Sequence, residues 1–372
     1  MPTIVVFILV LSVLVLVHEL GHFLAARVFG IRVDEFAFGL PFTKPIFKIQ
    51  RGETQYAIYP LFFGGFVRLH GEESEAKDDE KRSFFGRRKL QRALVIVAGV
   101  VMNVVLALVL FVALYGTLGV PVRTMDLVTI IDIETGAPAE TAGMKVGDRV
   151  VAVEGKQIES TEEFSRLMKS WAGIAVNVQV ERGETQALFE GLVQKDVEAV
   201  SLLMTPRLNP PEGKGPLGVS IARYPYITSA KCKALSAKCV SDAILAGVRS
   251  TGIWMGRVVD GFSQIGKSLS AGKAPEGIAG PVGIFKLTGI VAAEGLLPIV
   301  ELVAVLSVNL AVFNILPIPA LDGGRLMFIV IEWVRGKRVS PELEQKVNAW
   351  GMTALLALIA LITLGDVIRG LV

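Results

Sequence analysis

The stretch IVVFILVLSVLVLVHELGH, residues 4–22, decides how the rest of the sequence is interpreted. Its first part, Ile4 to Val17, carries no charge and is almost wholly Val, Leu and Ile, and His18-Glu19-Leu20-Gly21-His22 follows directly. On a helix, the spacing H-E-x-x-H puts two imidazoles on one face, one turn apart, where they can hold one zinc ion. The Glu between them is then free to act as a general base. Ionisable groups are costly in a lipid-spanning helix and are usually functional there, so the stretch predicts a metal site within a membrane.

The composition indicates an integral membrane protein. Of the 372 residues, 52% are hydrophobic, and the mean hydropathy of +0.56 is too high for an ordinary soluble globule. The net charge is only +3, so nothing suggests nucleic acid as a partner. The two cysteines, Cys232 and Cys239, match no redox or zinc motif. On one helix they would lie roughly 10 Å apart along the axis, too far to bridge, so we interpret them as unpaired small apolar residues.

Four segments are apolar enough to cross a bilayer, which needs about 20 apolar residues. We expect transmembrane helices at residues 1–30, 93–122, 298–322 and 347–368. A cleaved signal peptide is the alternative for the first segment, but a basic n-region and an A-x-A cleavage site are lacking. Residues 31–92 and 323–346 are rich in Lys and Arg, whereas the N-terminal flank has neither and the C-terminal tail has only Arg369. Both basic segments are therefore expected in the cytoplasm, with both termini and residues 123–297 outside it.

A catalytic zinc ion takes three protein ligands plus water, so the two histidines leave one ligand to be found. His70 is the only other histidine, and we expect it to be an exposed residue in a turn. Asp322 is the better candidate because it lies in NILPIPALDGG, residues 314–324, where two prolines break the helix and two glycines permit close backbone approach. Irregular backbone at membrane depth is tolerated only where it is buried in protein or lines a cavity. The alternative is a plain helix stop with an interfacial Asp.

The two motifs, H-E-L-G-H at 18–22 and N-x-x-P-x-P-x-L-D-G at 314–323, resemble those of the site-2 protease family of intramembrane zinc metalloproteases. The likeness is strongest to the bacterial proteases of the regulator-of-sigma-E type, and it includes Gly99-x-x-x-Asn103 and Gly280-Pro281-Val282-Gly283. The resemblance implies the following site residues: zinc ligands His18, His22 and Asp322, catalytic base Glu19, and substrate contacts Asn314 and Pro317.

The resemblance also implies the function. It implies a zinc (Zn2+) metalloendopeptidase of the bacterial inner membrane that cleaves single-span membrane proteins in or near their transmembrane segments. Such regulated intramembrane proteolysis releases anti-sigma factors or clears signal-peptide remnants. The nearest members of the family carry two tandem PDZ domains, whereas we find sequence for only one.

The expected fold class is a polytopic α-helical membrane protein with a membrane-associated β-hairpin sheet and an extracytoplasmic α+β PDZ domain. Residues 123–208 resemble that domain, with a helix over Thr161–Trp171 capped by Thr161 and a strand over Ala175–Glu181. Such a domain takes a peptide ligand by strand addition, or it only restricts access by its bulk. Residues 209–297 are expected to be a linker and an amphipathic helix, Thr228 to Leu269, on the membrane surface or packed on the spans.

Residues 31–92 are expected to hold a membrane-dipping hairpin. Ile46 to Leu69 alternates apolar and polar residues around Arg51-Gly52-Glu53, and the charged run Glu72 to Lys81 is expected to be a solvated loop. Residues expected at a sheet edge near the site are Phe47, Ile49, Tyr56, Ile58 and Tyr59. The family resemblance implies that the sheet pairs with substrate as an added strand. A peptide must unwind before hydrolysis, and an edge strand then supplies hydrogen-bond partners in lipid.

Two other classes of function remain open from the sequence. Intramembrane His and Asp also mark ion pathways, so a metal-ion transporter is one alternative. A transporter needs further polar residues along the spans, and few are found: Ser12, Asn103, Ser307 and Asn309. The other alternative is a PDZ-bearing adaptor with a dead protease centre, against which the intact motif residues argue.

Overall fold

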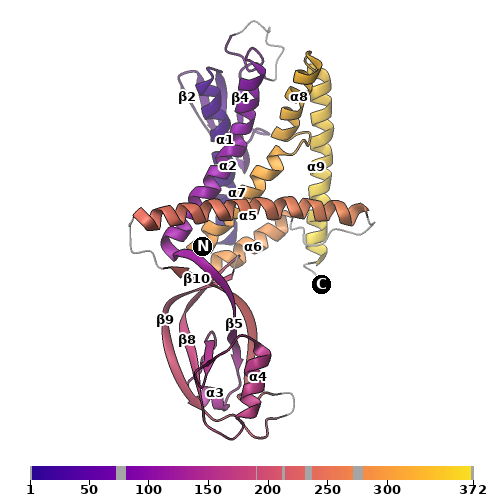
Figure 1. The fold of residues 1–372 in the computed structure, drawn as a ribbon. Helices are drawn as coiled ribbons and strands as arrows, with labels where there is room; N and C mark the ends of the chain where they lie inside the picture. The colour runs from indigo at the N-terminus through magenta and orange to yellow at the C-terminus, as the bar shows by residue number, and fades with distance from the viewer. Residues whose placement is uncertain are drawn as a thin grey trace. The chain divides into compact units, whose positions relative to one another are not determined.

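The computed structural model describes residues 2–72, 81–189, 191–211, 214–230, 237–270 and 280–369. The chain forms two compact units (Figure 1). Unit 1 comprises Met1–Leu114 and Ile244–Val372, and unit 2 comprises Tyr115–Ala243. Unit 1 holds the long apolar helices and a small sheet, whereas unit 2 is built on a second sheet.

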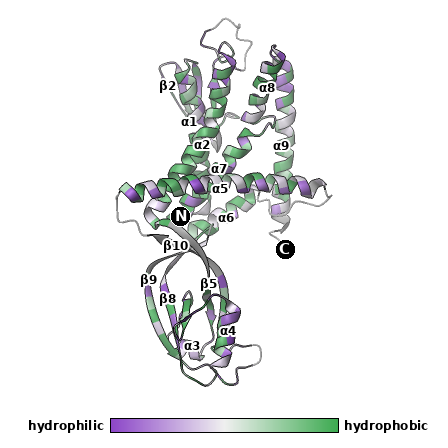
Figure 2. Ribbon diagram, viewed as in Figure 1, coloured by the Kyte–Doolittle hydropathy of each residue, from purple (hydrophilic) through white to green (hydrophobic). Residues whose placement is uncertain are grey.

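Among the described residues, four helices are long and apolar enough to cross a membrane. They are α1 (Thr3–Val28), α2 (Lys89–Leu118), α7 (Leu296–Ile315) and the part Glu342–Asp366 of α9 (Pro341–Arg369). Figure 2 shows hydrophobic residues along most of their length. Four such helices were expected, but the third ends at Ile315 and does not reach Asp322. In α7, 56% of the apolar window is buried against 0% in α9, so α7 is central and α9 peripheral.

The packing of α1 explains where its histidines point. Val6, Val10 and Leu14 form a buried cluster with Val303 of α7, and Leu106 and Leu110 of α2 pack against it. These α1 residues recur every four positions, which keeps them on one face of the helix. His18 and His22 continue the same spacing. The buried stripe of α1 therefore changes from apolar residues to the two histidines without leaving the interior.

Three further helices complete unit 1: α5 (Ala237–Ser270), α6 (Pro281–Ala293) and α8 (Asp322–Arg335). α5 runs crosswise over the long helices (Figure 1). It packs on them, since the rings of Phe262 and Phe313 of α7 lie 4.7 Å apart and Gly247 lies against Val112 of α2. α5 begins later than expected because residues up to Ala230 belong to a strand.

The expectation for the cysteines is wrong at Cys239, which is disulfide-bonded. The distance argument assumed that both cysteines lie on one helix, but α5 begins only at Ala237. Cys232 itself lies outside the described residues.

The sheet of unit 1 has the strand order β2-β3-β1-β4. Its strands are β1 (Val33–Leu40), β2 (Phe47–Arg51), β3 (Thr54–Ile58) and β4 (Leu61–Leu69). The hairpin expected around residues 51–53 is present, with Arg51 opposite Thr54 and Gly52 at a φ of +63°. The sequence did not reveal β1, which pairs in parallel with β3 and antiparallel with β4.

The expected sheet edge needs correction. Phe47 and Ile49 do lie on an edge strand, β2, but α1 packs mainly against β4 and β1, with a ring contact from Phe23 to Tyr56 of β3. Tyr59 is buried, and its hydroxyl donates a 2.8 Å hydrogen bond to Glu35. The edge beside the histidine helix is thus β4, because β1 inserts between it and the hairpin.

Unit 2 is a six-stranded sheet of order β5-β10-β9-β8-β6-β7 with helices α3 and α4. Its elements are β5 (Val120–Ile133), α3 (Pro138–Thr141), β6 (Arg149–Val153), β7 (Lys156–Gln157), α4 (Thr161–Ser170), β8 (Val176–Leu188), β9 (Gly191–Met204) and β10 (Val219–Ala230). The cap of α4 is Ser160, not Thr161, since the Ser160 hydroxyl accepts from the Glu163 amide at 3.1 Å. β8 continues past Glu181 because its pairing with β9 resumes after a bulge.

The segment after residue 208 is not simply a linker. β10 pairs with β5 from Val219 opposite Ile133 to Ala230 opposite Val120, so it returns the chain to the same sheet. Buried apolar residues of β5, β6, β8 and β9 form the core with Phe164 and Met168 of α4. Unit 2 therefore extends well beyond the expected boundary.

Candidate metal centre

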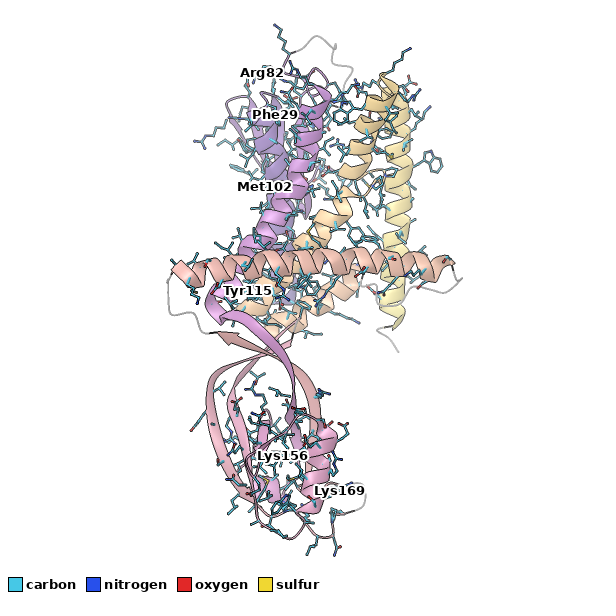
Figure 3. The ribbon with its side chains drawn as sticks, viewed as in Figure 1. Phe29, Arg82, Met102, Tyr115, Lys156 and Lys169 are labelled. Atoms are coloured by element: carbon cyan, nitrogen blue, oxygen red, sulfur yellow. The ribbon has the colours of Figure 1, made fainter. Side chains whose placement is uncertain are left out.

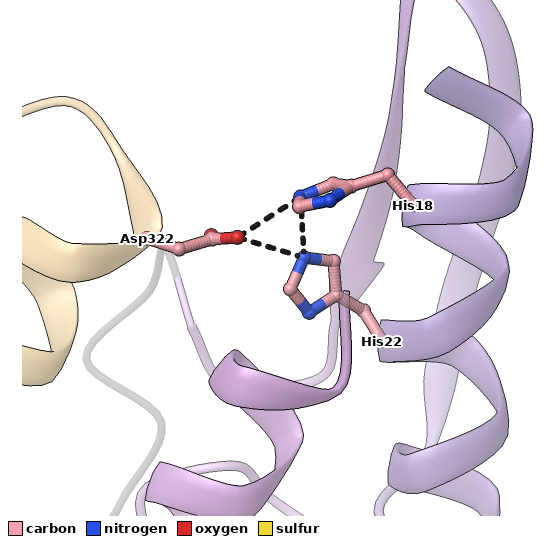
Figure 4. A group of neighbouring side chains, drawn as sticks. All are labelled: His18, His22 and Asp322. Atoms are coloured by element: carbon pink, nitrogen blue, oxygen red, sulfur yellow. Dashed lines mark hydrogen bonds and ion pairs between the residues drawn. The ribbon is translucent and has the colours of Figure 1, made fainter. Parts of the chain in front are cut away.

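His18, His22 and Asp322 meet in unit 1 although two distant parts of the chain supply them (Figure 4). The Asp322 Oδ2 atom lies 2.9 Å from His18 Nε2 and 3.2 Å from His22 Nε2. The two Nε2 atoms lie 3.1 Å apart. All three side chains are largely buried, and their ligand atoms lie within 4.8 Å of one another. The three residues predicted as metal ligands are therefore the three that come together.

Helix α2 approaches α1 closely at this level because two positions lack a side chain. A Cβ atom at Gly21 of α1 would overlap the backbone carbonyl of Ala98 and lie 2.8 Å from Cγ of Met102, which Figure 3 labels on α2. A Cβ atom at Gly99 of α2 would lie 2.5 Å from His22 Nε2 and 2.8 Å from His18 Cε1. Glycine is thus required at both contact points, and the Gly99-x-x-x-Asn103 pattern gains a physical reason.

The far side of each imidazole also has a partner on α2. His22 Nδ1 lies 2.9 Å from the carbonyl oxygen of Val95, and His18 Nδ1 lies 3.1 Å from Nδ2 of Asn103. Val95, Gly99 and Asn103 are four residues apart in sequence, so they share one face of α2. Sequence reasoning missed Val95 because a backbone carbonyl leaves no signal in the side-chain pattern. Such outer partners fix the ring orientation and tautomer of metal-ligating histidines.

Asp322 is positioned by the broken helix that the prolines predicted. α7 ends at Ile315, Leu316 before Pro317 is extended, and Ala320 adopts a φ of +77°. Asp322 is the first residue of α8, where the helix dipole favours a carboxylate.

Two close contacts hold the loop before α8 in place. Added Cβ atoms at Gly323 and Gly324 would strike the carbonyls of Ile315, Leu316 and Ile318, so the glycines let α8 fold against the loop. From α9, Asn348 accepts a 3.3 Å hydrogen bond from the Ala320 amide. The carboxylate therefore projects from a braced turn, not from a free linker.

A cavity of about 310 Å³ is lined by two of the three residues, His22 and Asp322. Its polar lining residues are Glu19, His22, Arg68, Glu72, Asp322 and Arg325. Arg325 of α8 and Glu72 form a 2.5 Å ion pair beside it, so Glu72 is not in a solvated loop as expected. Lys81, at the other end of that charged run, is exposed as expected, and residues 73–80 lie outside the described residues. The cavity is polar and contains the predicted general base.

The remaining predicted residues lie at different distances from the centre. Asn314 Nδ2 lies 3.3 Å from His18 Nε2, so this residue borders the centre. Pro317 is exposed in the loop before α8. His70 follows β4 in a turn, but it is not an exposed residue, since it is mostly buried and its Nδ1 lies 2.9 Å from Asp34 Oδ2.

The donor set fits zinc. Two imidazole nitrogens and one carboxylate oxygen are ligands that zinc takes in catalytic sites, with a position left for water. His22 Nδ1 faces a carbonyl, which can only accept, so its proton is on Nδ1 and its Nε2 is free to bind a cation. Both Nε2 atoms face the same carboxylate oxygen. The residues thus converge on one point with their ligand atoms.

Comparison with known proteins gives matches over nearly the whole chain. The model of peptidase family M50 matches residues 6–358. A Clostridium perfringens protein named "Putative zinc metalloprotease" is 33% identical over 362 residues, which cover 97% of each chain. Zinc metalloprotease RasP of Geobacillus kaustophilus is 28% identical over 446 residues, covering 99% of this chain and 98% of that one. Zinc metalloprotease RasP of Shouchella clausii is 29% identical over 446 residues, covering 99% of each.

Proposed function

The chain belongs to peptidase family M50, a family of zinc metalloproteases, and we propose that it hydrolyses peptide bonds in or near the transmembrane segments of single-span membrane proteins. One observation carries this proposal. His18 and His22 of a helix apolar enough to cross a membrane meet Asp322 beside a polar cavity that Glu19 lines. A metalloprotease that acts on soluble substrates has no need of a centre on such a helix.

Each residue of the centre has a proposed role. His18, His22 and Asp322 hold the zinc ion, which supplies a Lewis acid that makes water more acidic and polarises the scissile carbonyl. Glu19 lines the same cavity, so its carboxylate accepts a proton from the attacking water and passes it to the leaving amine. Asn314 borders His18 Nε2 and is suited to orient the substrate carbonyl.

We propose that substrate binds as an added strand on β4. β4 is an end strand of its sheet, and residues 66–69 of it line the cavity. Gly65 lies between β1 and α1, where an added Cβ atom would lie 3.4 Å from Glu19 Cγ. A substrate strand on this edge would run past the general base. Backbone pairing there replaces the helical hydrogen bonds that the substrate loses in lipid.

Unit 2 is proposed to be the PDZ-type module. A cavity of about 290 Å³ lies between α4 and the start of β10. Phe164, Met168 and Lys169 line it from the helix (Figure 3 labels Lys169), with Val219 and Ile221 on the strand. A helix and a strand with an apolar groove between them suit an extended peptide, which would add beside β10. The protein is a multi-pass membrane protein, and its Lys and Arg distribution supports a cytoplasmic position for residues 31–92 and an extracytoplasmic one for unit 2 and both termini.

The transport alternative gains no support from the polar residues of the spans. Ser12 and Asn309 donate to carbonyls four residues earlier in their own helices, at 2.6 and 2.9 Å. The Ser307 hydroxyl donates to the Asn103 carbonyl at 2.8 Å. These side chains are hydrogen-bonded to backbone carbonyls and do not form a chain of ligands across the spans.

The Glu19→Gln variant tests the proposed reaction. It keeps all three zinc ligands and removes the base, so we expect full zinc content and no cleavage of a single-span substrate in detergent or vesicles. The control is Glu53→Gln, an exposed glutamate in the β2–β3 turn, which should cleave at the unchanged rate. Normal cleavage by Glu19→Gln would refute the base assignment, and zinc flux into vesicles without cleavage would favour transport.

A further inference from the structure

Asn103 of α2 is a fully buried polar residue beside the metal centre, and its role is unassigned. Its Nδ2 atom lies 3.1 Å from His18 Nδ1. Its Oδ1 atom is also buried and has no hydrogen-bond partner within the described part of the chain. A buried amide oxygen without a partner is costly, so this arrangement needs an explanation.

Rotating the carboxamide by half a turn gives Oδ1 a partner, His18 Nδ1, and moves the unpaired position to the amide nitrogen. The oxygen and nitrogen ends of an Asn side chain have nearly the same shape, so the exchange disturbs no packing. Oδ1 then faces His18 Nδ1 and accepts a hydrogen bond from it. A neutral imidazole carries one proton, so a proton on Nδ1 leaves Nε2 with a free electron pair. Nε2 is the atom that faces Asp322.

The neighbouring histidine supports this orientation. His22 Nδ1 faces the Val95 carbonyl, which can only accept, so that ring already carries its proton on Nδ1. If Asn103 instead donated from Nδ2, His18 would carry its proton on Nε2 and could not ligate a cation with that atom. The two rings serve one centre only if both have an acceptor at Nδ1.

Asn103 is also held firmly enough to orient a ring. Its carbonyl accepts a 2.8 Å hydrogen bond from the fully buried Ser307 hydroxyl of α7. That bond fixes α2 against α7 at the level of His18. It involves the backbone of Asn103 and leaves the carboxamide free to face the imidazole.

We propose that Asn103 is a positioning residue of the metal centre. Its Oδ1 accepts the Nδ1 proton of His18, and this fixes the tautomer and ring orientation in which Nε2 binds zinc. The proposal rests on the zinc site of the proposed function. Removing an outer partner of a ligating histidine typically weakens metal affinity about 10–100-fold, which sets the size of the expected effect.

Zinc affinity tests the proposal without any substrate. Competition with a chelator is measured on full-length protein in detergent for the unchanged chain and for Asn103→Ala, Asn103→Asp and Ser307→Ala. We expect Asn103→Ala to bind zinc about 10–100-fold more weakly. Asn103→Asp keeps an acceptor oxygen and should retain most of the affinity. Ser307→Ala removes the hydrogen bond to the Asn103 backbone but keeps the carboxamide, so it should weaken zinc binding much less than Asn103→Ala does.

The histidine proton gives a second readout that poor folding alone does not mimic. The chain has 3 histidines, and His70→Ala removes the one outside the centre, so spectra of 15N-histidine-labelled protein contain only two rings of interest. In zinc-loaded protein the His18 Nδ1 proton should be visible and slow to exchange. In Asn103→Ala it should exchange faster, while the His22 proton, held by Val95, stays slow.

Two outcomes would overturn the assignment. One is that Asn103→Ala leaves both the zinc affinity and the exchange rate of the His18 Nδ1 proton unchanged. The other is that Asn103→Asp folds but binds zinc as weakly as Asn103→Ala does. His18→Ala separates this proposal from the zinc site on which it rests. If His18→Ala binds zinc as tightly as the unchanged chain, the zinc site itself is wrong. If the unchanged chain binds zinc at this site but cleaves no substrate, the proposed reaction is wrong and the zinc site stands.

Discussion

Gly99 is the residue on which the geometry of both imidazoles depends. The α2 backbone passes so close to α1 here that the space for a Cβ atom is already taken by His22 Nε2 and His18 Cε1. The sequence marks Gly99 only as part of a pattern, four residues before Asn103. Its physical role is to let the acceptors on either side of it, Val95 and Asn103, reach the rings.

We therefore predict that Gly99→Ala damages the centre. The added methyl group must displace the imidazoles or push the helices apart, and a misplacement of about 1 Å can cost about 100-fold in rate. Cleavage of a single-span substrate and zinc affinity should both fall. Gly116→Ala is the matched control, because it lies in the same helix and its Cβ atom meets nothing within 4 Å. Full activity of Gly99→Ala would mean that α1 and α2 are not this close.

At the scale of elements, the sequence predicted some parts well and others not at all. The apolar helix α1 and the face that carries both histidines follow from local periodicity, because residues four apart share a helix face. The β2–β3 hairpin follows from the turn at Gly52. The parallel pairing of β1 with β3 was missed, since such a partner is set by tertiary packing and not by neighbouring residues. Likewise, His70 was expected to be exposed because nothing in its own turn points to Asp34.

The contact between α2 and α8 rests on a buried ion pair. Arg92 Nη1 lies 2.9 Å from Glu332 Oε2, and the two side chains are only 7% and 11% exposed. Glu332→Leu leaves the Arg92 charge buried without its partner, and breaking a buried pair in this way costs about 3–5 kcal/mol. Because α8 carries Asp322, we predict lower stability in denaturant and weaker zinc binding.

The double variant Arg92→Met/Glu332→Leu checks that prediction. Replacing both charges by apolar side chains is often close to neutral, so the double variant should be more stable than Glu332→Leu alone. A double-variant cycle in denaturant measures the difference. If the two single changes simply add, the ion pair does not couple the helices.

In unit 2, the ion pairs of Glu134 should make the local structure less stable in acid. Hydrogen bonding to Lys214 at 2.6 Å, together with Arg207, lowers the pKa of Glu134 from its usual 4.5. Because the folded pKa is the lower one, the stabilisation is fully present above the usual pKa and is lost as the pH falls through the folded value. We predict that the protection of the amides of residues 214–218 against hydrogen exchange, relative to the intrinsic exchange rate at each pH, falls at acid pH in the unchanged chain. In Glu134→Gln this protection should already be low at pH 7 and should change little on acidification.

At the scale of the whole molecule, the site depends on chain topology that local sequence does not encode. His18 and Asp322 are 304 positions apart, yet their side chains touch. Each motif signals its own chemistry, and the resemblance to a known family joined them. The extent of unit 2 was missed for the same kind of reason. β10 joins its sheet mainly by pairing with β5, from Val219 opposite Ile133 to Ala230 opposite Val120.

Metal removal should therefore loosen one unit and leave the other unchanged. Zinc at the proposed site between α1 and α8 would bind the folded state only, and it would then stabilise that state by about 4.1 kcal/mol at a concentration 1,000 times the dissociation constant. We predict that a chelator speeds hydrogen exchange in α1 and at the start of α8, and leaves the strands of unit 2 as protected as before.

Two histidine variants make the chelator experiment decisive. His22→Ala lacks a ligand and should exchange fast in α8 with or without chelator. His70→Ala lies outside the metal group and should respond as the unchanged chain does. Equal loosening of both units would mean that the chelator acts elsewhere. If hydrogen exchange in α8 does not change with chelator, Asp322 holds no metal. A metal at this site would link α8 to α1 through the Asp322 carboxylate.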